Sequence, residues 1–83
     1  MYLHLGSSIS IPTGDIIGIF DLDNATTSKI TRKYLKNAEM IVAVSDDLPR
    51  SLVVSCPQGS WQRVYFSPLT PATLLGRLTS LRI

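Results

Sequence analysis

Four basic residues in segment 29–36 are the side chains best suited to binding a ligand. They are Lys29, Arg32, Lys33 and Lys36. On a helix these positions fall within roughly 100° of arc, and no acidic residue lies among them. Such a cluster can contact nucleic-acid phosphates and release their condensed counterions. The alternative is a solvated helix face without a ligand, and the residues alone leave both interpretations open.

Arg50 is a second candidate for a phosphate contact. It follows Pro49, where a loop enters an expected strand, and an arginine there can reach a phosphate or a groove. Asp46 and Asp47 precede it and are expected to neutralise part of its charge. The strength of an Arg50 contact therefore depends on these two acids.

The residues needed for catalysis or metal binding are largely missing from the sequence. His4 is the only histidine and Cys56 the only cysteine, and no serine lies in a nucleophile-elbow motif. Asp21 and Asp23 resemble part of a calcium loop, but the glycine and the bidentate glutamate of that loop are absent. The glycines match no dinucleotide or phosphate-binding loop. We therefore predict no enzymatic activity, metal, cofactor or small-molecule substrate.

Size and composition favour a small domain that self-associates. The chain has 83 residues, of which 45% are hydrophobic and 17% charged, against about 25% charged in an ordinary soluble domain. A chain of this size buries only about 60–65% of its unfolded surface, so apolar surface remains for a partner. The net charge of +2 neither demands nor excludes a polyanion.

The protein is expected to be cytoplasmic. A single cysteine allows no intrachain disulfide, and secreted domains of this size usually need several. The longest apolar run, Ile16 to Phe20, is far shorter than the roughly 20 residues of a membrane span. The opening residues lack the basic and apolar regions of a signal peptide. We expect no membrane partner.

Hydrophobic periodicity predicts an α+β fold for residues 1–83, taken as a single domain. Strands are expected at 2–5, 9–11, 16–20, 41–44, 52–54 and 63–66. A helix capped by Ser28 should run from Lys29 to about Ala38, and a second should begin at Pro71 behind a Thr70 cap. The apolar face of the second helix is expected to consist of Leu74, Leu75, Leu78 and Leu81. The order β-β-β-α-β-β-β-α favours a mixed or mostly antiparallel sheet of about six short strands with two helices.

Four motifs resemble the bacterial extracellular-matrix regulatory protein B family, in the same order and over nearly the whole chain. They are Met1-Tyr2-Leu3-His4-Leu5-Gly6, Asp15-Ile16-Ile17-Gly18-Ile19-Phe20-Asp21, Pro49-Arg50-Ser51-Leu52-Val53-Val54, and Val64-Tyr65-Phe66-Ser67-Pro68-Leu69-Thr70 with Thr73-Leu74 and Arg77. The sibling family, regulatory protein A, is a DNA-binding activator of biofilm-matrix operons. That sibling looks like a ring-shaped homo-oligomer around which DNA can wrap, so the resemblance implies a ring here.

The resemblance to the sibling family extends to three individual arginines. Arg32, Arg50 and Arg77 stand where the sibling has arginine. The chain departs from the sibling at Asp15 and at Asp46-Asp47-Leu48, because the sibling's DNA-contacting loops carry further arginines there. An aspartate in place of an arginine turns attraction to phosphate into repulsion.

These observations predict a cytoplasmic bacterial transcriptional regulator of biofilm-matrix genes that forms a homo-oligomeric ring and binds double-stranded DNA through its backbone. The expected DNA-binding residues are Arg50, Lys29, Arg32, Lys33, Lys36 and Arg77. Specificity should come from DNA shape and from repetition around the assembly. The alternative is an oligomeric protein-interaction module that modulates other regulators without binding DNA.

Overall fold

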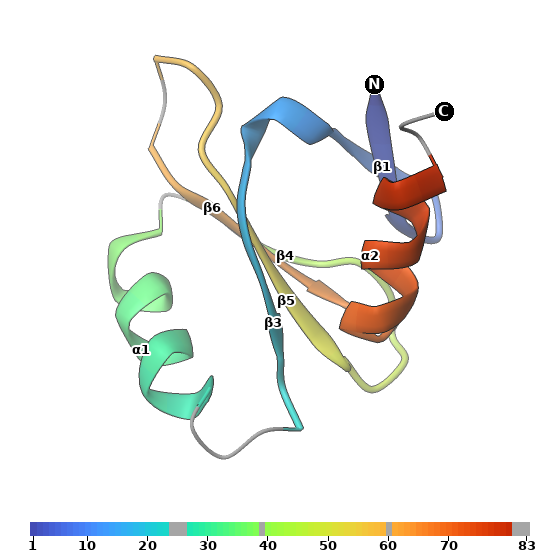
Figure 1. The fold of residues 1–83 in the computed structure, drawn as a ribbon. Coiled ribbons are helices and arrows are strands. Elements are labelled where there is room, and N and C mark those ends of the chain that lie inside the picture. Colours follow the sequence, from blue (N-terminus) through green and yellow to red (C-terminus); the bar gives the residue numbers. More distant parts are fainter. Residues whose placement is uncertain (24–26, 39, 60, 81–83) are drawn as a thin grey trace.

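The protein forms an α+β fold in the computed structural model, which describes residues 1–23, 27–38, 40–59 and 61–80 (Figure 1). The strands are β1 (Tyr2–Gly6), β2 (Ile9–Pro12), β3 (Ile16–Asp21), β4 (Met40–Ala43), β5 (Ser51–Ser55) and β6 (Arg63–Ser67). The helices are α1 (Thr27–Asn37) and α2 (Pro71–Ser80), and a 3-10 turn, η1 (Thr13–Asp15), lies between β2 and β3. Apart from this turn, helices and strands follow the predicted order.

The expected α+β class, six strands and two helices are confirmed, whereas the expectation that the strands form a single sheet is wrong. The strands divide into a hairpin of β1 and β2 and a four-stranded sheet of order β3-β5-β6-β4. In that sheet β4 runs parallel to β6, whereas β3–β5 and β5–β6 are antiparallel. The physical reason is η1, which separates β2 from β3 so that β3 pairs with β5 instead of extending the hairpin.

The four-stranded sheet is covered on both faces (Figure 1). Along β5 every residue is buried, and successive side chains of a strand point to opposite faces. Leu52 and Val54 pack on the α1 side, together with Val64 of β6. Val53 packs on the other side with the hairpin and α2, where Leu3, Leu5, Ile11, Tyr65 and Leu74 are also buried. The sheet is thus the middle layer of three.

A buried polar contact joins the hairpin to the sheet. Ser67 Oγ donates a hydrogen bond to Leu5 O at 2.6 Å and accepts one from Leu69 N at 3.1 Å. Gly6 has a φ of 123°, which favours glycine, and a Cβ there would lie 3.3 Å from the Pro68 ring. The first and the last of the four motifs that carry the resemblance therefore meet in space, where their residues hold the hairpin against the sheet.

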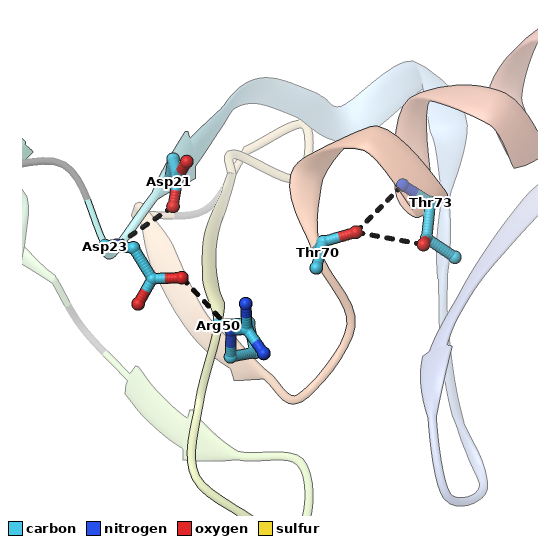
Figure 2. A network of polar contacts seen from close by, with 5 residues as sticks. All are labelled: Asp21, Asp23, Arg50, Thr70 and Thr73. Atoms are coloured by element: carbon cyan, nitrogen blue, oxygen red, sulfur yellow. Dashed lines mark hydrogen bonds and ion pairs between the residues drawn. The ribbon is translucent and has the colours of Figure 1, made fainter.

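The structure confirms the predicted cap of α2 and corrects the predicted first residue of α1. Thr70 Oγ1 accepts a hydrogen bond from Thr73 N at 3.2 Å, as expected for the start of α2 (Figure 2). At the other helix, α1 begins at Thr27 instead of Lys29, and the capping contact predicted for the Ser28 side chain lies outside what the structure describes. Several hydroxyl residues precede Lys29, and any of them suits a cap. The sequence pattern therefore did not decide at which residue the helix begins.

The predicted apolar face of α2 is only partly buried. Leu74 is fully buried, and Leu78 packs against the same core. Leu75 is 52% exposed, because it is rotated by about 100° from Leu74 around the helix. The predicted core position of Leu75 is therefore wrong, whereas Leu81 lies outside the described residues.

Candidate nucleic-acid interface

Helix α1 is fixed on the sheet by an apolar stripe. Tyr34 and Leu35 of the helix pack against the core on this side of the sheet, as does Ala38 directly after the helix. The Tyr34 ring lies 5.5 Å from the ring of Phe20 in β3, centroid to centroid, with a tilted geometry. A Cβ on Gly18 would lie 2.7 Å from the Phe20 ring, so only glycine leaves room for this arrangement.

The opposite side of α1 carries the predicted basic cluster, which we call the basic face. Its residues Lys29, Arg32, Lys33 and Lys36 are all exposed. None of these four side chains forms an ion pair with a described residue, because the ion pair found among the described residues joins Arg50 to Asp23. Their mutual repulsion is therefore not offset by an acidic neighbour there, and a polyanion would relieve it.

Arg50 is neutralised by a residue other than those expected. Its Nε lies 3.1 Å from Asp23 Oδ2, and both side chains are about half exposed (Figure 2). Asp23 is itself held by a turn in which Asp23 N donates to Asp21 Oδ1 at 2.9 Å. The pairing of Arg50 with Asp23 was not predicted, because the two residues are far apart in sequence.

Arg77 makes a hydrogen bond within the protein that stabilises the fold. Its Nη1 donates a hydrogen bond to His4 O at 3.0 Å and so ties α2 to β1. Helix α2 lies on the side of the sheet opposite α1 (Figure 1). The structure therefore brings Lys29, Arg32, Lys33 and Lys36 together, but it does not bring Arg77 to the basic face.

A groove that the sequence pattern did not predict lies beside the basic face. It has a volume of about 420 Å³ and is lined by Lys33, Tyr34, Asn37, Cys56, Trp61 and Gln62. Trp61, in the loop between β5 and β6, is 73% exposed. The sequence signal was a lone tryptophan in a polar loop, but the neighbouring α1 residues follow only from the fold.

The other chemically interesting residues have local roles. His4 Nε2 lies 2.8 Å from Ser7 O within the hairpin turn. Asp21 and Asp23 form a turn at the end of β3. In the described parts of the chain, no group of three or more His, Cys, Asp or Glu residues could hold a metal ion. No described helix is long and apolar enough to cross a membrane.

No family model matches the chain. The chain is 40% identical over 78 residues to extracellular matrix regulatory protein B of Bacillus subtilis (strain 168). The match covers 93% of this chain and 89% of the relative. The chain therefore belongs to the extracellular matrix regulatory protein B family, as its motifs predicted.

Proposed function

We propose that this protein is a cytoplasmic DNA-binding regulator that controls transcription of biofilm-matrix genes as a homo-oligomeric ring. The regulatory role rests on the relative, which is named for regulation of the extracellular matrix. The DNA-binding role rests on the basic face, whose four cations are exposed and carry no ion pair to an acid in the described chain.

The basic face suits the DNA backbone better than base edges. Three of its four residues are lysines, which act toward phosphate as point charges rather than as planar forks. Backbone contacts position a protein on DNA but carry no sequence information. Specificity would therefore come from DNA shape and from the repetition of the basic face around the ring.

The free edges of the four-stranded sheet support self-association. β3 and β4 are its edge strands, and each exposes apolar side chains: Ile17 is 52% exposed on β3, and Met40 and Ile41 are 46% and 54% exposed on β4. An exposed apolar edge is a template for pairing with another chain. Pairing of β4 with β3 of the next copy would be a head-to-tail contact, which closes into a ring where the rotation allows.

A protein-interaction module that modulates other regulators is the second candidate. The observation that favours it is a set of exposed acidic groups at the end of β3 and in the loops after β3 and β4, namely Asp21, Asp23, Asp46 and Asp47. They repel phosphate and suit a basic protein partner. DNA binding would then be absent from a correctly assembled oligomer.

The test is fluorescence anisotropy of labelled duplex DNA at several salt concentrations, after light scattering has fixed the oligomer's mass. Four phosphate contacts per bound subunit predict a slope of roughly −3.6 in log affinity against log salt. Removing two cations with Lys29→Ala and Lys36→Ala should make the slope shallower by about 1.8 per bound subunit.

A matched control separates local contacts from net charge. The pair Ser8→Asp and Ser10→Asp changes the net charge equally, but both residues are exposed on the hairpin, away from α1. This control variant should keep a slope of log affinity against log salt close to that of the original chain. No duplex binding by an intact oligomer at low salt would overturn the proposal and favour the protein-interaction module.

A further inference from the structure

The groove between α1 and the β5–β6 loop combines an aromatic platform with a cation. Trp61 is 73% exposed and lines the groove together with Lys33 of the basic face and the half-buried Tyr34. An indole left in water offers a large flat surface for stacking. Lys33 belongs to both the groove and the basic face, so a ligand bound in one is in reach of the other.

The remaining groove residues supply hydrogen-bonding groups without negative charge. Asn37 and Gln62 contribute side-chain amides, and none of the lining residues that the structure describes is an aspartate or glutamate. Asn37 Nδ2 donates to Lys33 O at 3.1 Å, which leaves its Oδ1 as an acceptor. A planar ligand that has both donors and acceptors and is attached to a negative charge fits this set of groups.

We propose that the groove binds one unpaired base of single-stranded DNA. Trp61 stacks on the base, Asn37 and Gln62 hydrogen-bond to its edge, and Lys33 contacts the adjoining phosphate. The groove's volume of about 420 Å³ lies within the usual range of small-ligand sites, about 300–1,000 Å³. Base stacking on aromatic side chains beside a cationic track is the common mode of single-strand binding.

Stacking on Trp61 also decides whether the bound DNA is single-stranded or double-stranded. In a duplex the faces of the bases are covered by their neighbours, so Trp61 can stack only on a base that is unpaired or flipped out. This inference rests on the proposed function, because the basic face must carry the phosphates that follow the bound base. A regulator with both surfaces would hold DNA that has opened locally.

The test uses Trp61 as its own reporter, because it is the only tryptophan in the chain. The assembled protein is titrated with a short oligo(dT), with the matching duplex and with thymidine monophosphate. Oligo(dT) should quench the tryptophan emission at saturation, whereas the intact duplex should leave it nearly unchanged. Equal affinity for the mononucleotide and for oligo(dT) would overturn the assignment to a strand.

Substitutions of Trp61 test whether this side chain makes the contact with the base. By anisotropy of labelled oligo(dT), Trp61→Ala should weaken binding by roughly 5- to 100-fold, whereas Trp61→Phe should keep most of the affinity. Leu48→Ala is the control, since Leu48 is 80% exposed on a loop elsewhere, and it should bind as the original chain does. Duplex affinity should be unchanged in all three variants.

The outcomes separate this inference from the proposed function. If duplex binds through the basic face while oligo(dT) neither quenches Trp61 nor depends on it, the groove assignment is overturned and the proposed function stands. If oligo(dT) binds through Trp61 but duplex does not bind, duplex recognition is overturned and the groove stands. If neither binds, both are overturned.

Discussion

Ser67 Oγ donates a hydrogen bond to Leu5 O at 2.6 Å, and both residues are fully buried. This contact links the β1–β2 hairpin to the four-stranded sheet, and no strand pairing joins these two units in the described residues. The same oxygen accepts from Leu69 N at the approach to α2. A single hydroxyl thus connects hairpin, sheet and the segment leading to the last helix.

Ser67→Ala should therefore lower the free energy of unfolding by about 1–3 kcal/mol, because it leaves the buried Leu5 carbonyl and the Leu69 amide without this partner. The measurement is urea denaturation followed by circular dichroism. Ser51 is the matched control: it faces Ser67 in the β5–β6 register, and its buried Oγ has no hydrogen-bond partner in the described structure. Ser51→Ala should be neutral or stabilising, and an equal loss in both variants would refute the role assigned to Ser67.

The packing of α1 can be tested at Gly18. A Cβ there would lie 2.7 Å from the Phe20 ring, so Gly18→Ala should displace the ring from Tyr34 and destabilise the protein by about 1–3 kcal/mol. Gly76 is the control, since a Cβ there meets nothing within 4 Å. Gly76→Ala should stabilise α2 by about 0.5–1 kcal/mol. Thermal unfolding of the two variants should shift in opposite directions.

Much of the fold could be predicted from local patterns. Strand and helix positions, the Thr70 cap and the exposure of the basic face follow from periodicity and turn chemistry within a few neighbouring residues. The division into two sheets could not be predicted, because the partner of β3 is decided by η1 and by pairing with the distant β5. Local pattern contains no information on which of several apolar strands pair.

In the candidate site too, the contacts within one helix could be predicted, whereas the contacts between distant segments could not. The four α1 cations form one surface as expected, because they belong to one helix. The Arg50–Asp23 ion pair and the Trp61–Lys33 groove each join loops or elements that are distant in sequence. Arg77 was assigned to DNA by resemblance, but its hydrogen bond to His4 O depends on how α2 packs on the hairpin.

The Arg50–Asp23 pair makes a prediction about charge. If Arg50 can contact DNA, Asp23→Asn should release it and tighten duplex binding by a factor of a few, with a steeper salt dependence. The free energy of unfolding should change by less than about 1 kcal/mol, because both side chains are about half exposed. The measurement is duplex anisotropy beside urea denaturation.

The control for this effect is Asp47→Asn, which removes the same charge from an exposed position outside the ion pair. A general charge effect would tighten binding equally in both variants. In that case Arg50 is not a DNA contact, and the basic face of α1 would account for the binding alone.

The sheet edges give the last prediction, which concerns assembly. Ile41 lies on edge strand β4 and is 54% exposed, so Ile41→Lys should place a charge in the proposed contact between copies and oppose edge-to-edge pairing. Leu48→Lys introduces the same charge at a residue that is 80% exposed in a loop, outside any strand. Light scattering should show a smaller mass for Ile41→Lys alone, together with weaker duplex binding, because fewer basic faces then act on one DNA molecule. An unchanged mass in Ile41→Lys would mean that the copies assemble through another surface, and the basic faces would have to be arranged around that surface instead.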